Sequence, residues 1–244
     1  MTFADLLRSL DRLVARRQGG TVYTPNVAHV VMAEYDRSLR SAYASVDVSV
    51  ADGVPLLWAS RLLRPALPAK LSGSDLVVPI SEHAAARGWR VSLVGGMPGS
   101  AAEAAKRLTA LCGVEIVGVD DSQIDLANSE ADEPLLRRIR DVRPDLIFLA
   151  LGAPKQEIWA QRVRERVGGA VIIGVGASLD FVAGRVQRAP PWMSRVGLEW
   201  LFRLAQEPRR LWRRYLVEGP HFIPILLRSL RLPHHERRRV VRLP

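Results

Sequence analysis

RVSLVGGMPGSAAEAAKRLTALCGVEIVGV, residues 90–119, is the stretch of sequence that decides the fold. It opens with the apolar run Arg90–Val94, turns at a group of glycines, and continues through Ser100–Leu111 with helical spacing of its apolar residues. A second apolar run, Val114–Val119, follows directly. A strand, a helix and another strand in this order predict a parallel β-α-β unit, because parallel strands need a long crossover between them.

The same alternation extends in both directions along the chain. Continuous apolar strands separated by helices are typical of a parallel sheet that is buried on both faces. The sequence therefore predicts an α/β fold in which helices cover both faces of a parallel sheet. The other strands are expected at Thr21–Tyr23, Val46–Val50, Leu146–Leu151 and Ala170–Val175, and the other helices at 4–17, Val27–Arg37, Val54–Leu63, from Lys70–Asp75 through Arg87, Glu133–Asp141 and Gln156–Val167.

The positive charge of the chain is concentrated at its C-terminal end. The whole chain has a net charge of +10, and 11 Arg and three Glu after Trp200 contribute +8 of it. We therefore predict two parts: an α/β core over residues 1–195, and an arginine-rich, helical appendage over residues 196–244.

The predicted appendage is also apolar, since Leu, Ile, Trp and Phe residues alternate with its arginines. This mixture favours a helix that lies on an anionic membrane surface. Two other interpretations stay open: a helix pair that packs on the core with its arginines in water, and a nucleic-acid arm. No apolar run approaches the roughly 20 residues of a membrane span. We expect a cytoplasmic protein, peripheral on the inner face of the cell membrane, with no nucleic-acid partner and with homo-oligomerisation left open.

Ligands of such sheets bind beyond the carboxyl ends of the strands. Three segments there contain residues that are suited to binding or catalysis. The first is the turn with Gly95, Gly96 and Gly99, whose amides at a helix start suit a phosphate. Its spacing differs by one residue from the dinucleotide-binding pattern. An ordinary tight turn is the alternative interpretation.

The second segment contains Asp52, which follows a predicted strand and precedes Gly53. A carboxylate in this place suits a general base toward a hydroxyl group. An N-cap of the helix that begins at Val54 explains the same residue equally well.

The third segment, residues 151–159, places Gln156 at the start of a helix, where its amide suits an anion or a sugar. The sequence has no Asp-x-Asp pair, and its five histidines lack zinc-site spacing. We therefore expect no metal and no cofactor, so that arginines, lysines and amides would neutralise a bound diphosphate.

Taken in order, several motifs resemble the WecG/TagA/CpsF family of bacterial glycosyltransferases, from about Thr21 to about Tyr215. They are Thr24-Pro25-Asn26, Ala51-Asp52-Gly53, Lys70–Asp75, Gly152–Glu157, Gly176–Asp180 with Gly184, Arg188-Ala189-Pro190, and Gly197–Arg203 with Glu207-Pro208.

The resemblance implies an inverting, metal-independent transfer of an N-acetylmannosamine-type or related hexose. The donor would be a UDP-sugar, and the acceptor a sugar on a polyprenyl diphosphate lipid, in cell-envelope polysaccharide or teichoic-acid-type synthesis. It also implies that Asp52 is the catalytic base and that an appendage meets the membrane. The substrate-binding residues implied are Thr24, Asn26, Gln156, Arg203, Arg210 and Arg213.

One position departs from the family pattern, because Lys70 stands where members usually carry Arg. Lysine keeps the charge at this substrate-binding position but loses the bidentate fork. Two other functions stay open from the residues alone. One is a nucleotide-cofactor-dependent, Rossmann-like oxidoreductase or methyltransferase that uses the glycine turn. The other is a non-catalytic basic adaptor for a membrane or a nucleic acid.

Overall fold

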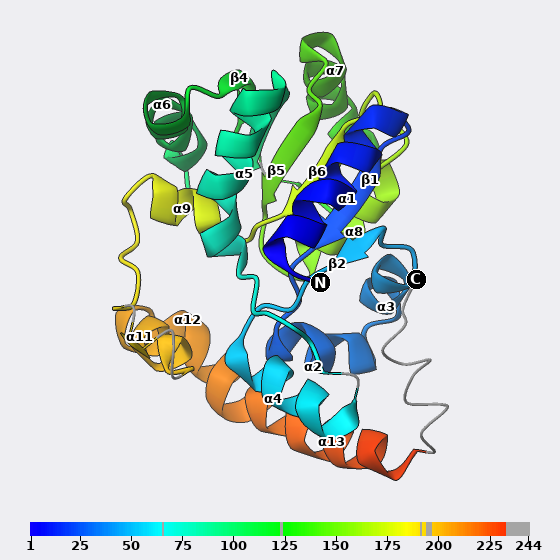
Figure 1. Ribbon diagram of the computed structural model, residues 1–244, viewed down its shortest axis with the longest axis vertical. Helices are drawn as coiled ribbons and strands as arrows, with labels where there is room; N and C mark the ends of the chain where they lie inside the picture. Colours follow the sequence, from blue (N-terminus) through cyan, green and yellow to red (C-terminus); the bar gives the residue numbers. More distant parts are fainter. Residues whose placement is uncertain (65, 123, 191, 194–196, 233–244) are drawn as a thin grey trace.

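One parallel sheet forms the centre of the protein in a computed structural model (Figure 1). The structure describes all residues except 65, 123, 191, 194–196 and 233–244, and it describes Arg210 by its backbone alone. The predicted α/β fold, with helices on both faces of a parallel sheet, is confirmed.

The sheet has the strand order β2-β1-β6-β5-β3-β4, and every pairing within it is parallel. Its central strands are buried along their whole length, as continuous apolar runs predict. The strands are β1 (Gly20–Tyr23), β2 (Val48–Ser49), β3 (Arg90–Gly95), β4 (Glu115–Asp120), β5 (Leu146–Ala150) and β6 (Val171–Gly174).

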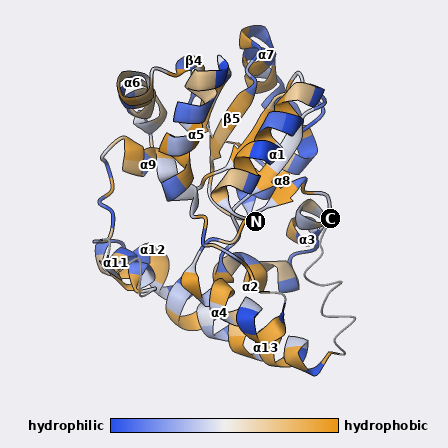
Figure 2. Cartoon of the chain, viewed as in Figure 1, coloured by the Kyte–Doolittle hydropathy of each residue, from blue (hydrophilic) through white to orange (hydrophobic). Residues whose placement is uncertain are grey.

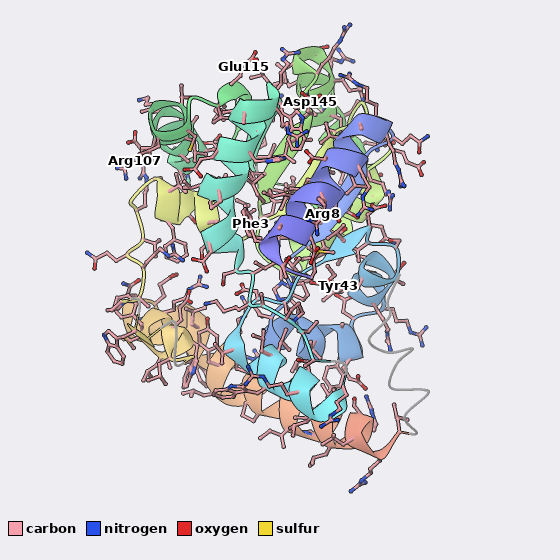
Figure 3. The ribbon with its side chains drawn as sticks, viewed as in Figure 1. Phe3, Arg8, Tyr43, Arg107, Glu115 and Asp145 are labelled. Carbon is pink, nitrogen blue, oxygen red and sulfur yellow. The ribbon has the colours of Figure 1, made fainter. Side chains whose placement is uncertain are left out.

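Side chains of β1, β3, β5 and β6 enter two separate apolar clusters. In β5, Phe148 lies in one cluster, whereas Ile147 and Leu149 lie in the other. Helices α1 (Phe3–Arg16), α5 (Gly73–Arg87), α6 (Ser100–Cys112) and α9 (Ser178–Val182) supply the first cluster. Helices α3 (Arg37–Ala44), α7 (Glu133–Val142) and α8 (Lys155–Val163) supply the second. Charged side chains such as Arg107 and Glu115 lie at the periphery (Figure 3).

Three predicted elements differ from the structure by two or more residues at one end. The predicted helix Val27–Arg37 ends earlier, as α2 (Val27–Tyr35), because the Asp36 side chain accepts the amides of Ser38 at 2.8 Å and Leu39 at 3.0 Å and so begins α3. The predicted strand Val46–Val50 keeps only the two residues of β2 at an edge of the sheet. The predicted helix Gln156–Val167 stops at Val163, as α8.

The described part of the appendage is helical and packs at the carboxyl end of the sheet. It contains α11 (Glu199–Gln206), α12 (Pro208–Trp212), the irregular helical turns η2 (Arg213–Glu218) and η3 (Gly219–His221), and α13 (Phe222–Arg231). Helix α13 packs against α2 and α4 (Val54–Leu63) at the bottom of Figure 1. Among the described helices, none is both long enough and apolar enough to cross a bilayer.

Candidate active site

A pocket of about 320 Å³ lies beyond the carboxyl ends of β1 and β2, between the core and the appendage. The core contributes Asn26, Asp52 and Lys70 together with the first residues of α4. The appendage contributes Glu199, Trp200, Arg203, Arg214, Tyr215 and Phe222. Neither part encloses the pocket alone, although the sequence predicts them as separate units.

Backbone hydrogen bonds place Asp52 in this pocket. The chain after β2 runs between two other segments: the Asp52 amide donates to the Pro25 carbonyl at 2.7 Å, and the Leu71 amide donates to the Ala51 carbonyl at 2.9 Å. The next residue, Gly53, has φ +112°, a conformation that glycine adopts without strain. The turn therefore points the chain into α4 while Asp52 stays beside the loop that carries Pro25.

The side chain of Asp52 does not cap α4. Gly53 occupies the N-cap position, and none of the described side chains caps this helix. Instead, Asp52 Oδ1 accepts a hydrogen bond from the Ser72 hydroxyl. Of the two interpretations of Asp52, the structure therefore excludes the helix cap.

Burial is the main cause that raises the pKa of the Asp52 carboxyl above its ordinary value. The hydrogen bond from Ser72 lowers this pKa, the charge of Glu199 raises it, and the charges of Lys70 and His29 lower it; the net direction is upward. A carboxylate with a raised pKa accepts a proton more readily, as a general base requires.

Cationic side chains from both parts of the chain line the same pocket. Lys70 Nζ lies 3.6 Å from Glu199 Oε2, so this ion pair joins the core to α11. The Arg203 guanidinium lies over the Phe181 ring at 5.5 Å, and its buried Nε has no hydrogen-bond partner among the described residues. A buried donor without a partner is costly, and an anionic ligand would satisfy it.

Asn26 begins α2 and is fixed there by its own capping contacts. Its Oδ1 accepts the Ala28 amide at 3.0 Å, and its backbone amide donates to His29 Nδ1 at 3.2 Å. Behind it, His29 Nε2 lies 3.3 Å from Oε1 of Glu157, which is fully buried. A buried carboxylate and a buried imidazole thus stand behind one wall of the pocket.

Thr24 and Gln156 lie at the same edge of the sheet but outside the residues that line the pocket. The Thr24 hydroxyl donates to the Gly174 carbonyl at 3.1 Å and links the ends of β1 and β6. Gln156 is 2% exposed, accepts the Gly176 amide at 3.0 Å and donates to Glu157 at 2.7 Å. In this structure, both side chains therefore form hydrogen bonds with residues at the strand ends.

The turn at Gly95, Gly96 and Gly99 does not reach the pocket. It follows β3, which β5 and β6 separate from β1. Two backbone amides of this turn already donate to carboxylates: the Met97 amide donates to Asp180 at 2.8 Å, and the Gly99 amide donates to Asp121 at 3.2 Å.

The predicted arginines of the appendage differ in position. Arg203 lines the pocket, whereas Arg213 is 76% exposed and lies 3.7 Å from Glu218. Arg214, its neighbour, lines the pocket instead. The side chain of Arg210, although predicted to bind the diphosphate, lies outside the described residues.

Within the described part of the chain, no group of three or more His, Cys, Asp or Glu side chains is arranged to hold a metal ion. The side chains that line the pocket have chemistry of their own: the cations suit an anionic ligand, and Asp52 suits the removal of a proton.

The sequence matches the WecG/TagA/CpsF family of glycosyl transferases over residues 1–236. The chain belongs to this family. It is therefore a glycosyltransferase, and the resemblance in the motifs is confirmed. The family implies in general a nucleotide-sugar donor, a lipid-linked acceptor and a role in cell-envelope polysaccharide or teichoic-acid synthesis.

Several residues of this glycosyltransferase site escaped the sequence analysis. Ser72, Glu199 and Arg214 contact or line the pocket, and only the structure reveals their roles. His29 had a local signal, since it stands three residues after the N-cap Asn26 and completes a capping box. Glu157 ends the Gly152–Glu157 motif, but its burial was not predicted, because a charged residue beside Gln156 is expected to face solvent.

Proposed function

We propose that this glycosyltransferase transfers a sugar from a UDP-sugar to a sugar on a polyprenyl diphosphate lipid, with inversion at the anomeric carbon and without a metal. The donor sugar would be N-acetylmannosamine or a related hexose. The observation that carries the proposal is the half-buried Asp52, whose raised pKa suits a base, in a pocket lined by Lys70, Arg203 and Arg214.

In this mechanism, Asp52 takes the proton of an acceptor hydroxyl, and the oxygen attacks the anomeric carbon on the face opposite to UDP. The bond from that carbon to the UDP oxygen breaks as the new glycosidic bond forms. Negative charge grows on the leaving diphosphate, and fixed cations stabilise this charge most strongly where water is excluded. The buried Nε of Arg203, which has no hydrogen-bond partner in the described part of the chain, supports its assignment to this role.

Asn26 is proposed to hold a sugar hydroxyl beside Asp52, since it lines the same pocket. Thr24 and Gln156 are proposed to contact the substrate only after a change in side-chain position, because both are buried and hydrogen-bonded. Lys70 is proposed to bind a phosphate as a point charge. The phosphate would then replace Glu199 as its partner. The same proposal assigns Arg210 and Arg213 to the diphosphate.

The enzyme would act on the inner face of the cell membrane, where its lipid-linked acceptor is located. The net charge of +8 in the segment after Trp200 supports this location, since basic residues near an anionic bilayer contribute about 1 kcal/mol each to binding.

The test is incubation of the enzyme with a panel of UDP-sugars and a short-chain acceptor with a diphosphate-linked sugar, read by mass spectrometry. Transfer with release of UDP supports the proposal, and NMR of the product reports the anomeric configuration. A product of retained configuration would exclude the single-displacement mechanism. Stabilisation by NAD or S-adenosylmethionine, but not by UDP, in a thermal-shift assay would favour the oxidoreductase or methyltransferase alternative.

A further inference from the structure

Large apolar side chains are exposed in pairs around the pocket. Each pair has i, i+4 spacing, so its two members lie on one face of a helical segment. Single exposed apolar residues are normal on a protein surface, whereas contiguous patches mark contacts. The pairs are Trp58 (54% exposed) with Leu62 (60%), Trp212 (51%) with Leu216 (56%), and Ile223 (60%) with Leu227 (52%).

Two of these pairs lie on helices that pack against each other. Trp58 and Leu62 belong to α4 of the core, and Ile223 and Leu227 belong to α13 of the appendage. Helices α4 and α13 are in contact and run along each other at the bottom of Figure 1. Apolar stretches of both are visible in Figure 2.

The charges beside these pairs identify the partner. Arg61 and Arg64 are exposed at the end of α4, and Arg231 is exposed at the end of α13. Exposed apolar side chains with arginines beside them suit the headgroup region of an anionic bilayer. A second copy of the chain would bring the same arginines against each other across a two-fold interface.

The pocket lies at one end of the same two helices. Val54 and Pro55, at the start of α4, line it from the core, and Phe222, at the start of α13, lines it from the appendage. A lipid held at the exposed pairs is thus close to Asp52 without leaving the surface of α4 and α13.

We propose that α4 and α13 together form one membrane-docking face for an anionic bilayer, and that the lipid-linked acceptor enters the pocket between the first turns of these helices. The core is thus part of the membrane contact. The entry route rests on the proposed function, whereas the docking face does not.

The docking face is tested by vesicle cosedimentation of the full chain carrying both Trp58→Ala and Leu62→Ala. Vesicles of phosphatidylcholine with phosphatidylglycerol are compared with vesicles of phosphatidylcholine alone. All arginines remain in this variant, so any loss comes from apolar insertion. We expect binding to the anionic vesicles to fall by at least about tenfold, because each buried apolar side chain contributes more than a factor of ten.

Leu111→Ala is the matched control, since Leu111 is 70% exposed on α6, away from α4 and α13. It should bind vesicles as the wild type does. Ile223→Ala with Leu227→Ala gives an independent variant on the other helix and should lose binding as well. Thermal unfolding checks that each variant is folded, which is expected because the changed side chains are exposed.

Unchanged vesicle binding by the folded α4 variant would overturn the proposal, as would an equal loss in Leu111→Ala. Dissociation of a dimer by the α4 variant with vesicle binding intact would assign the face to a second copy and also overturn it.

Transfer assays separate the docking face from the proposed function. The α4 variant should match the wild type on a short-chain, water-soluble acceptor and lose at least about tenfold on a long-chain acceptor in vesicles, in line with its loss of binding. Equal rates of variant and wild type on the long-chain acceptor would overturn the entry route. If the wild type transfers no sugar to either acceptor while the α4 variant loses vesicle binding, the proposed function fails and the docking face stands.

Discussion

Asp52→Asn is expected to abolish transfer while the fold is retained. The asparagine Oδ1 still accepts the Ser72 hydroxyl, and the backbone contact to Pro25 at 2.7 Å is unchanged. The variant therefore keeps these contacts but loses the negative charge and the ability to take a proton. Loss of a general base costs about 10²–10⁴ in rate, which corresponds to about 3–5 kcal/mol of activation free energy.

The stability of the same variant provides a second, independent expectation. Because burial raises the pKa of Asp52 in the folded chain, the folded state binds this proton more tightly than the unfolded state does. Stability therefore decreases as the pH rises from the ordinary value of an aspartate to the raised value. Asp52→Asn has no such loss, so above this window it should be at least as stable as the wild type.

The assay measures turnover of a UDP-sugar with a short-chain acceptor, together with thermal unfolding at acidic and neutral pH. Removal of a general base lowers the rate by at least about 10²-fold. A folded variant that keeps more than about a tenth of the wild-type turnover would therefore refute the assignment of Asp52. A variant less stable than the wild type at neutral pH would show that the carboxylate is favourably paired in the folded state, contrary to the direction of its pKa shift.

Three further expectations concern the surroundings of Asp52. Glu199→Gln removes a charge that raises the pKa of Asp52, so it should move the acidic limb of the pH–rate profile to lower pH. Ser72→Ala removes a hydrogen bond that lowers this pKa, so it should move the limb to higher pH. Shifts of both variants in the same direction would contradict this account. Arg203→Ala should lower turnover on a soluble acceptor by about 10²-fold, as expected for a donor to the leaving charge, and by more than Arg213→Ala, whose side chain is 76% exposed; equal effects would remove the distinction. Turnover should survive EDTA, and a loss that Mg²⁺ or Mn²⁺ restores would show that a metal neutralises the diphosphate.

Much of the fold follows from local patterns in the sequence. Helix α4 has the predicted bounds Val54–Leu63, because Gly53 and Pro55 mark its start and Pro65 follows its end. Helix α3 was missed, since the predicted helix ended at Arg37 and no element was predicted before Val46; in the structure, Asp36 is the N-cap that begins α3. The length of the second strand was overestimated because apolar residues flank β2. This strand lies at the edge of the sheet, where only Val48 and Ser49 pair with β1.

The site was less predictable because its geometry depends on contacts between distant segments. Asp52 was identified because it directly follows a predicted strand, and strand ends lie at one edge of a parallel sheet. The roles of Ser72 and Glu199 depend on loops that approach Asp52 only in the folded chain. Likewise, the irregular turns of η2 decide that Arg214 rather than Arg213 lines the pocket, and residue spacing does not reveal such turns.

The basicity of Asp52 and the position of the appendage are linked through the pocket. Burial is the first cause of the raised pKa, and the charge of Glu199, on α11, raises it further. Side chains of the appendage form one wall of the pocket, and the pair of Lys70 with Glu199 joins that wall to the core. Movement of the appendage away from the core would remove the charge of Glu199 from Asp52 and so lower this pKa. In the proposed mechanism, the carboxylate is therefore the stronger base while Glu199 and Arg203, which lie on the same helix, are both at the pocket, and proton removal is favoured in the state in which a cation is positioned to stabilise the leaving group.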